Sequence, residues 1–308
     1  MSHRPRVAVV GSLIVDLVFR ADRRPGPGET FTGTDFGIYL GGKGFNQAIA
    51  CRRLGAEVTL VGRVGQDHFG DMFLARLKDE GMTADHITRD EKTGTGIASP
   101  VVFPDGENSI IGVPRANRFL TPSDVDRARV AIASADILML QLEVDPQASR
   151  HAAGLASSHG TTVMLDPAPV HLHVSIDDWP LDYLVPNEVE ARILASGPDT
   201  TGFARRRVDA GLRAVVISEG RQGATIADAA GVRCVPAYRV KTVDSTGAGD
   251  AFRGGLAVSL AQGTDIDQAV RYAGACGALA CTRVGAEPSM PAASEVTEFL
   301  RRTDEHSD

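Results

Sequence analysis

The sequence of 308 residues has few cysteines, no excess of positive charge and no long apolar run. No C-x-x-C pair or nearby zinc-finger histidine accompanies its four cysteines, Cys51, Cys234, Cys276 and Cys281, so we expect reduced core thiols. A net charge of −7 argues against a nucleic-acid-binding surface. No apolar run reaches membrane-spanning length, and the N-terminus lacks the apolar core of a signal peptide. These absences favour a cytoplasmic protein that binds neither nucleic acid nor membrane.

Two common phosphate-binding signatures are also missing. Residues 6–10 predict a buried first strand, but no G-x-G-x-x-G follows it, which argues against a dinucleotide-binding start. Residues 37–43 match the first seven positions of a P-loop, but Gly44 occupies the position of the required Ser or Thr. A Walker-type site would therefore lack its magnesium ligand. The glycines still suit close approach to a polar ligand, with Asn46 facing it.

The most informative stretch is residues 243–252 (VDSTGAGDAF), in which glycines flank an alanine and Asp250 opens a helix of small residues. The first turn of a helix has free N–H groups and partial positive charge, and glycines let an anion approach them. A carboxylate at that rim would repel a bound phosphate, but it can act as a base for phosphoryl transfer. The alternative is a helix cap after a glycine turn.

From residue 121 onward, predicted helices and strands alternate: helices at 122–133 and 146–158, and strands at 137–142, 162–165, 183–185 and 214–217. The strands end at polar residues, namely Glu143, Asp166, Asn187 and Ser218. Ligands bind at the carboxyl edge of open parallel sheets, and four such residues in succession favour a site over isolated caps or turns. The pattern predicts an α/β fold, and the length allows one large domain or two small ones. We expect a single domain over residues 1–308.

A small extra sheet is expected beside the main one. Its strands, which we call the lid, would come from residues of about 13–40 and 94–114, and the second segment would form a hairpin with its turn at residues 104–107. Asp16 is an isolated acid in one of these apolar strands. Its carboxylate either faces water at the strand end or accepts hydrogen bonds from substrate hydroxyls.

Two motifs and three shorter segments carry a family resemblance. The motifs are residues 41–48 (GGKGFNQA) and 244–250 (DSTGAGD), and between them lie 141–143 (QLE), 166–169 (DPAP) and 186–190 (PNEVE). In this order they resemble the PfkB/ribokinase family of carbohydrate kinases over nearly the full chain, with the ribokinases as the most similar branch. The resemblance implies a central, mostly parallel sheet flanked by helices, and a small β-sheet lid.

The resemblance also implies an activity: transfer of the ATP γ-phosphoryl group to the exocyclic hydroxyl of a pentose, with ribose as the expected substrate. It implies Mg²⁺ bound with ATP, a K⁺ ion beside the anion hole, and a homodimer formed through the lid. Two alternatives stay open within the superfamily, a nucleoside kinase and a kinase for another sugar. A non-catalytic sugar-binding regulator is the alternative from a different class.

The resemblance further assigns roles to individual residues. The catalytic base would be Asp250, and the anion hole would be the N–H groups of Gly247, Ala248 and Gly249. The sugar site would consist of Asp16, Gly42, Lys43, Gly44, Asn46, Glu143 and Asp250. The nucleotide site would consist of Asn187, Ser218, Glu219, Gly220, Arg221, Gln222, Gly223, Gly249 and Gly274. The magnesium region would be Asn187 and Glu190, and the potassium site Asp244, Thr246, Ala280, Arg283, Gly285 and Ser289.

Three residues near the expected sugar site depart from the ribokinase pattern. Ile14 occupies the position of a sugar-contacting Asn in many ribokinases, and Phe45 replaces a usual Ala. Arg115 replaces the usual Gly of a Gly-Ala-Asn run. Because an apolar side chain cannot supply the hydrogen bonds of an amide, kinase chemistry is more firmly indicated than ribose. Phe45 could stack on a nucleobase or pack beneath the lid, and Arg115 could bind an anionic or larger substrate or be a solvated lid residue.

Overall fold

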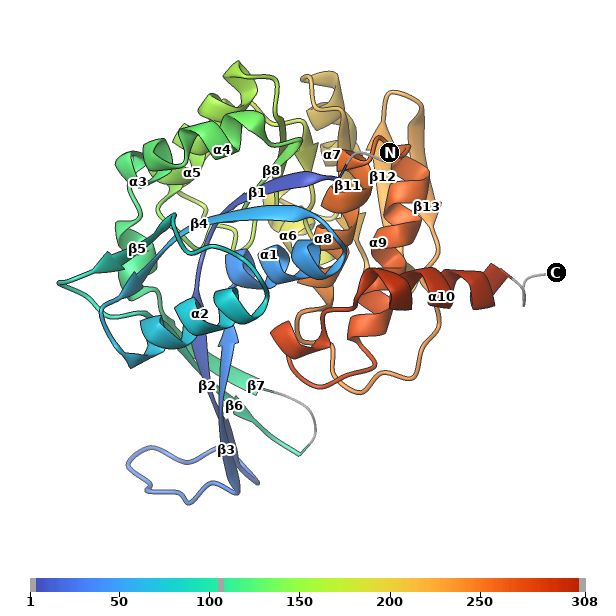
Figure 1. Cartoon of the computed structure of the whole chain (residues 1–308). Coiled ribbons are helices and arrows are strands. Elements are labelled where there is room, and N and C mark those ends of the chain that lie inside the picture. Colours follow the sequence, from blue (N-terminus) through green and yellow to red (C-terminus); the bar gives the residue numbers. More distant parts are fainter. Residues whose placement is uncertain (1–3, 105–107, 305–308) are drawn as a thin grey trace.

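The computed structural model describes residues 4–104 and 108–304, which form one nine-stranded sheet and one four-stranded sheet (Figure 1). The strands of the large sheet are β1 (Arg6–Val10), β4 (Glu57–Gly65), β5 (Ile87–Asp90), β8 (Ile137–Leu140), β9 (Thr162–Leu165), β10 (Tyr183–Leu184), β11 (Ala214–Ser218), β12 (Ala224–Asp228) and β13 (Gly231–Val235). Their order in the sheet is β13-β12-β11-β10-β9-β8-β1-β4-β5. All neighbours from β11 to β5 are parallel. The predicted mostly parallel sheet is confirmed.

The helices cover both faces of this sheet. They are α1 (Lys43–Arg53), α2 (His68–Asp79), α3 (Pro122–Arg127), α4 (Arg129–Ser134), α5 (Pro146–Ser158), α6 (Glu188–Leu194), α7 (Thr200–Asp209), α8 (Ala248–Ala261), α9 (Ile266–Ala280) and α10 (Ala293–Asp304). In β1, Val7 and Val9 join the core of α1, α2, α8 and α9, whereas Ala8 and Val10 join the core of α3, α4, α5 and α7. Successive side chains of a strand point to opposite faces, so β1 is apolar throughout because both faces are buried.

Two local predictions differ from the structure. The helix expected over residues 122–133 is divided into α3 and α4, because the Ala128 N–H bonds to the Val125 carbonyl three residues back. The antiparallel strands β12 and β13 extend the sheet beyond β11. The elements predicted from the sequence do not include these two strands. No helix in the described ranges has the length and hydropathy needed to cross a bilayer.

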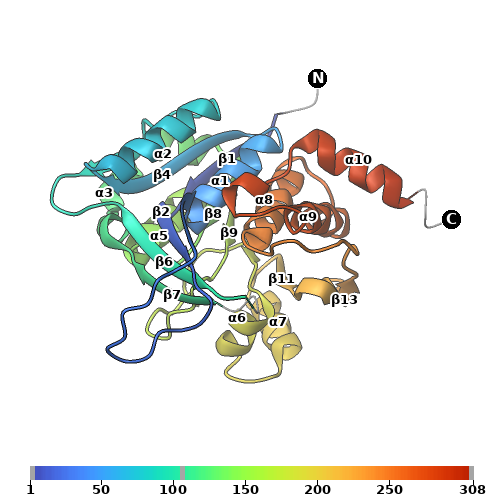
Figure 2. The same cartoon turned by 90° about the horizontal axis from the view of Figure 1, so that it is seen from below.

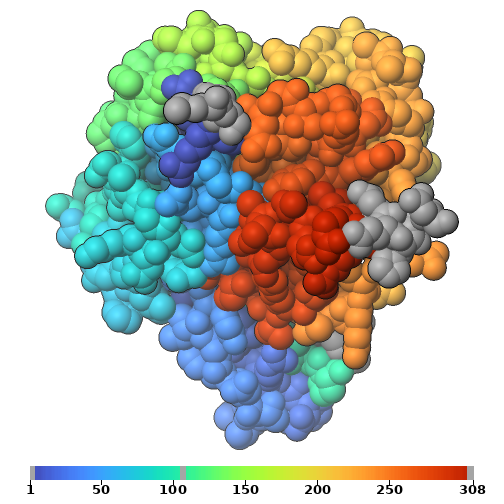
Figure 3. All heavy atoms as spheres, turned by 45° about the vertical axis from the view of Figure 1, so that its right-hand side comes forward, coloured from blue at the N-terminus to red at the C-terminus, as the bar shows by residue number. Residues whose placement is uncertain are grey.

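The four-stranded sheet is the lid, and it projects from one end of the body (Figures 1 and 3). Its order is β3 (Asp35–Gly41), β2 (Ile14–Arg20), β6 (Gly96–Val102) and β7 (Asn108–Val113). Strands β2 and β6 are parallel, and the outer pairs are antiparallel. The turn expected between β6 and β7 includes residues 105–107, which lie outside the described residues. Residues 37–41 lie in β3, which agrees with the rejection of a P-loop.

Candidate active site

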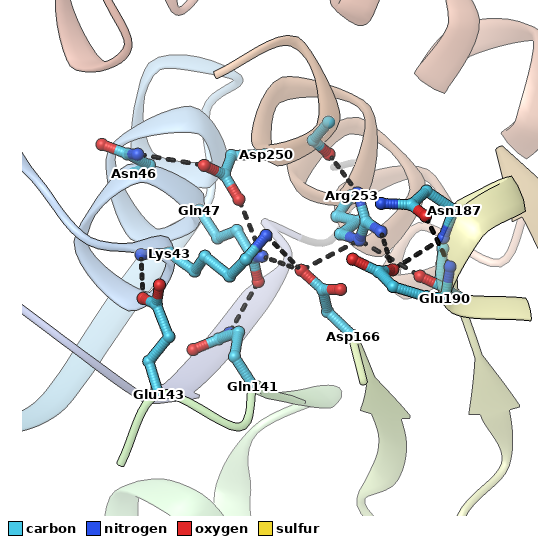
Figure 4. Close-up of polar contacts among 12 residues, drawn as sticks. Lys43, Asn46, Gln47, Gln141, Glu143, Asp166, Asn187, Glu190, Asp250 and Arg253 are labelled. Atoms are coloured by element: carbon cyan, nitrogen blue, oxygen red, sulfur yellow. Dashed lines mark hydrogen bonds and ion pairs between the residues drawn. The ribbon is translucent and has the colours of Figure 1, made fainter. Parts of the chain in front are cut away.

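The candidate site lies where helix α1 packs against helix α8 (Figures 2 and 4). The two helices approach closely because Gly254 has no side chain: a Cβ atom there would lie 2.6 Å from the Cβ of Ala50. This contact brings Asn46 and Gln47 of α1 opposite Asp250 of α8 (Figure 4). Small residues in both helices therefore determine the geometry around the expected base.

Two side-chain amides hold the carboxylate of Asp250, which is 7% exposed. Asn46 Nδ2 donates to one oxygen at 3.0 Å, and Gln47 Nε2 donates to the other at 3.1 Å. Hydrogen bonds to both oxygens fix the orientation of the carboxylate. The buried Oδ1 of Asn46 has no hydrogen-bond partner among the described residues. That oxygen is therefore available to accept a hydrogen bond from a ligand hydroxyl.

The start of α8 has the geometry of an anion site. Gly247 has φ +77°, and a Cβ atom there would lie 2.8 Å from the Cα of Ala286. The next N–H, that of Ala248, donates to the Ser245 carbonyl at 3.2 Å. Of the three N–H groups assigned to the anion hole, one is therefore shared with a turn, and the Gly249 N–H lies in the first turn, where intrahelical partners are lacking.

Lys43 is the cation at the centre of the site. Burial opposes its charge, but nearby carboxylates, Asp166 first and then Asp250, hold the pKa of Lys43 above its usual value. Its Nζ lies 3.5 Å from Asp166 Oδ2, and its backbone N–H donates to Glu143 at 2.9 Å. The ammonium group therefore remains charged where a phosphoryl group would arrive.

Two carboxylates, Asp16 and Glu143, lie on the lid side of the site. Burial, followed by the charge of Glu143, raises the pKa of Asp16 to about 6. Burial also raises the pKa of Glu143, which accepts hydrogen bonds from the Ser12 hydroxyl and the Lys43 N–H. Asp16 adjoins Gly41, where a Cβ atom would lie 2.6 Å from Asp16 Oδ2. Two half-buried acceptors close together suit a ligand with several hydroxyl donors.

The glycines of this loop shape the backbone. Gly42 has φ +88°, a conformation that favours glycine. At Gly44, a Cβ atom would lie 2.4 Å from the Ser12 nitrogen, and the Gly44 N–H donates to the Ser12 hydroxyl at 3.3 Å. The structure therefore places Gly44 in a packing contact between α1 and the segment that follows β1.

The Asn187 and Glu190 pair forms a capping box at the start of α6. Asn187 Oδ1 accepts from the Glu190 N–H at 2.8 Å, and Glu190 accepts from the Asn187 N–H at 2.7 Å. Burial and then the charge of Asp166 raise the pKa of Glu190, which lies 3.5 Å from Arg253. Because Asn187 also forms a parallel bridge with Ser218, the pair adjoins the predicted nucleotide loop.

That loop continues from β11 into a short 3₁₀ turn, η2 (Gly220–Gln222). Three of its residues, Gly220, Arg221 and Gln222, are exposed, whereas Glu219 accepts a hydrogen bond from the Thr225 hydroxyl at 2.9 Å. At Gly223, which has φ +107°, a Cβ atom would lie 2.0 Å from the Val235 carbonyl oxygen. Gly274 lies in α9, where a Cβ atom would contact the Tyr238 ring at 3.6 Å. The structure gives these residues no contact with Asp250.

The predicted potassium residues lie in two adjacent segments. Asp244 accepts from the Gly285 N–H at 2.9 Å and from the N–H and hydroxyl of Thr246 at 2.9 and 2.7 Å. The Ala280 carbonyl accepts from the Arg283 N–H at 3.1 Å, and the Ser289 hydroxyl donates to the Ala286 carbonyl at 2.7 Å. No group of three or more His, Cys, Asp or Glu side chains could hold a metal ion within the described chain. The donor set is therefore dominated by carbonyl oxygens, which suit a hard cation.

Four buried residues belong to the site without an individual role predicted from the sequence, although the sequence places one of them, Asp166, at the predicted sheet-edge site. Gln141 Nε2 donates to Gln47 at 2.6 Å, and Gln47 donates to Asp166 at 2.9 Å and to Asp250 (Figure 4). Arg253 lies 3.0 Å from Asp166. A signal for Arg253 was present, because it is the one charged residue in the otherwise apolar and small sequence 251–258.

The contacts of Phe45 and Arg115 are with other residues of the chain. Phe45 is fully buried and contacts Phe73 edge to face, with ring centroids 4.9 Å apart. Arg115, at φ +45°, donates to the Thr95 carbonyl at 3.1 Å and lies over Gly94, where a Cβ atom would meet its guanidinium. Neither the stacking hypothesis for Phe45 nor the ligand hypothesis for Arg115 gains support from these contacts.

A helix N-terminus with a fixed carboxylate and a nearby lysine is typical of enzymes that transfer phosphoryl groups. The model for the pfkB family carbohydrate kinases matches residues 4–293. The chain is 38% identical over 297 residues to a ribokinase of Bacillus subtilis, covering 96% of this chain and 99% of that protein. It is 35% identical over 300 residues to a deoxyribokinase of Salmonella typhi, covering 96% and 98%. The structure of Arabidopsis thaliana ribokinase complexed with ribose and ATP matches with a TM-score of 0.89 and 28% identity, covering 97% and 99%. The chain belongs to the pfkB family of carbohydrate kinases, which confirms the resemblance.

Proposed function

We propose that this protein is an ATP-dependent pentose kinase that transfers the γ-phosphoryl group to the exocyclic hydroxyl of ribose. The observation that carries the proposal is the Asp250 carboxylate, held by Asn46 and Gln47 in the first turn of α8. The similarity to the Bacillus subtilis ribokinase and to the ribokinase complexed with ribose and ATP supports it.

In the proposed reaction, Asp250 accepts the proton of the attacking hydroxyl. The sugar oxygen forms a bond to the γ-phosphorus while the bond to the bridging oxygen of ADP breaks. The N–H groups of Gly247 and Gly249 and the Lys43 ammonium hold the oxygens of the transferring group. Asp16, Glu143 and the free Asn46 Oδ1 accept hydrogen bonds from the other sugar hydroxyls.

The nucleotide would enter as MgATP along the Asn187, Ser218 and Gly223 side of the site. The Glu190 carboxylate is a suitable oxygen ligand or water acceptor for the magnesium of that substrate. The bridge between Asn187 and Ser218 supports a shared phosphate and nucleoside surface. Gly274 is a further candidate on this side.

A K⁺ ion would be held by Asp244, Ser289 and the carbonyls of Thr246, Ala280, Arg283 and Gly285. The residues fit the ion, because Asp244 and Gly285 are joined directly and the remaining donors are neutral oxygens. The ion would supply a fixed positive charge beside the start of α8. Asp244 would orient the loop before Gly247.

A homodimer through the lid is proposed from its exposed apolar side chains. Five of them, Phe19, Phe36, Ile38, Ile111 and Val113, share one face of the lid, and Tyr39 and Ile110 lie on the other face. Large exposed apolar patches often mark interaction surfaces, and a second lid would cover the face with five. The family match supports one functional domain with a lid. The four free cysteines support a cytoplasmic setting, although only Cys51 and Cys276 are the core thiols that the sequence predicts, because Cys281 is half-buried and Cys234 is exposed.

A second candidate substrate is deoxyribose. Ile14 and Asp16 are two residues apart in β2, so their side chains lie on the same face. An apolar Ile14 on the sugar side would tolerate a pentose that lacks one hydroxyl, and the similarity to a deoxyribokinase agrees with this candidate. A nucleoside kinase is less well supported, because the Phe45 ring is buried in the core.

The test is ADP release with MgATP and K⁺ against ribose, deoxyribose, fructose, 2-keto-3-deoxygluconate, adenosine and inosine. The highest kcat/KM with ribose would support the proposal, and a preference for deoxyribose would favour the second candidate. Preference for a nucleoside or another sugar would overturn the pentose assignment. Tight sugar binding without ADP release for any acceptor would instead indicate a non-catalytic regulator.

A further inference from the structure

Arg253 is a charged residue of α8, the helix that carries Asp250, and its side chain is buried. It lies one turn after Asp250 in α8, and its side chain is 3% exposed. Its Nη1 donates to the Gly249 carbonyl at 3.1 Å, and its Nε donates to the Val185 carbonyl at 3.2 Å. The guanidinium is therefore fixed by the backbone on two sides.

Two carboxylates lie beside Arg253. The nearer is Asp166, which follows β9 and is 1% exposed, and Glu190 Oε2 lies 3.5 Å from Arg253 Nη2. A single oxygen of Asp166, Oδ2, lies 3.0 Å from Arg253 Nε and 3.5 Å from Lys43 Nζ (Figure 4). The same oxygen accepts the Gln47 amide at 2.9 Å, and Gln47 also holds Asp250. Removing one partner of a buried ion pair leaves an uncompensated charge, so the two cations and the carboxylate depend on one another.

The two cations that share Asp166 differ in their freedom to move. The Lys43 side chain is 27% exposed, whereas that of Arg253 is 3% exposed and hydrogen-bonded to two carbonyls. The Arg253 charge also opposes the charge on Lys43. Lys43 is therefore the cation that can leave Asp166 when an anion arrives.

We propose that Arg253 is a positioning residue that stays on Asp166 and weakens its hold on Lys43, so that Lys43 can contact the phosphoryl group of ATP. The proposal rests on the proposed kinase function. Without Arg253, Lys43 and Asp166 would form a closed buried pair, and Lys43 would compensate the carboxylate instead of the phosphoryl oxygens. If Asp166 were removed together with Arg253, Lys43 would have no Asp166 carboxylate to pair with and would remain available to the phosphoryl group.

The test is a double-mutant cycle of Arg253→Gln and Asp166→Asn. For each variant we would measure kcat, sugar KM, thermal unfolding and the affinity for Mg²⁺ with β,γ-imido-ATP. We expect Arg253→Gln to lower kcat about 10²-fold and analogue affinity about tenfold, with sugar KM changed by less than about twofold. In the Asp166→Asn background, Arg253→Gln should cost nothing, because there is no carboxylate left to trap Lys43.

The matched control is Arg233→Gln, which breaks ion pairs with Asp228 and Asp267 outside the site. It should lower the unfolding temperature and leave kcat unchanged. Wild-type kcat in Arg253→Gln, or an equal loss from this change in both backgrounds, would overturn the proposal.

If Arg253→Gln does not fold, the comparison of Asp166→Asn with the double variant decides: a loss of about 10²-fold in the double variant overturns the proposal, and no loss supports it. If the wild type phosphorylates no sugar, the kinase proposal is wrong. The affinity for β,γ-imido-ATP in the four proteins of the cycle then still tests whether Arg253 weakens the contact between Asp166 and Lys43.

Discussion

The polar cluster around Asp250 and the lid differ in how their side chains are satisfied. Asp250, Asp166 and Arg253 are at most 7% exposed, and each has several partners within the chain. In the lid, Phe36 is 51% and Ile111 is 75% exposed, so apolar surface faces outward. Among the described residues, three buried oxygens of this network still lack a hydrogen-bond partner, namely Asn46 Oδ1, Gln141 Oε1 and Asp166 Oδ1, whereas the surface that the lid leaves exposed is apolar. Contacts within the body therefore hold the polar cluster in place, whereas the lid exposes apolar side chains to solvent.

The largest effect is expected on kcat, from a substitution of Asp250 in the polar cluster. Asp250→Asn keeps the shape of the side chain but removes the base, so kcat should fall about 10²–10⁴-fold. Ribose binding should be largely retained, as measured by calorimetry. The control Asp178→Asn breaks an exposed ion pair with Arg150 and should leave kcat unchanged. A near wild-type kcat in Asp250→Asn would end the assignment of the base.

The next largest effect is a loss of stability, which should be large for truncation of a buried aromatic side chain and small for an exposed one. Phe45→Ala should lower the free energy of unfolding by about 3–5 kcal/mol, because it leaves a cavity against Phe73. Phe119→Ala, at a position that is 55% exposed, should change it by less than about 0.5 kcal/mol. Urea unfolding measures both. An equal, small effect at the two positions would contradict the core placement of Phe45.

Sugar binding should depend on pH through Asp16, which lies where the lid meets the body. Burial is the main cause that raises the pKa of Asp16 to about 6. In the protein without bound sugar, the Asp16 carboxylate therefore gains a proton as the pH falls through 6. Only the ionised form offers all its lone pairs to sugar hydroxyls, so the sugar KM should rise about tenfold per pH unit below 6 and level off above it. Glu143, whose pKa is also raised, changes charge in the same direction.

The profile is measured as sugar KM between pH 5 and 8, with Asp16→Asn as the comparison. That variant should bind sugar more weakly and lose the part of the pH dependence that belongs to Asp16. The same steep profile in both proteins would show that another group is responsible.

The smallest effect on stability is expected in the lid. Ile111→Lys should change the free energy of unfolding by less than about 0.5 kcal/mol, because the side chain is exposed. It should nevertheless shift a lid-mediated dimer toward monomer, as measured by light scattering. Leu172→Lys, at an 87% exposed position outside the lid, should leave the mass unchanged. A monomeric wild type would refute the homodimer.

Much of the architecture could be predicted from the chain, because its periodic patterns are local. The strand at 162–165 and the helix at 146–158 have the predicted bounds. The antiparallel strands β12 and β13 were missed, because short strands at a sheet edge carry a weak pattern. The division of the helix after Ala128 depends on a single turn hydrogen bond, which no periodicity reveals.

The sequence by itself determined the family, the mostly parallel sheet and the position of Asp250 at a helix start, because motif spacing and hydrophobic period are properties of neighbouring residues. Only the tertiary structure decided which side chains meet that carboxylate. Gln47, Asp166 and Arg253 come from α1, the end of β9 and α8, and they converge because Gly254 lets two helices approach. Contacts between residues so distant in sequence depend on packing, and local patterns do not encode them.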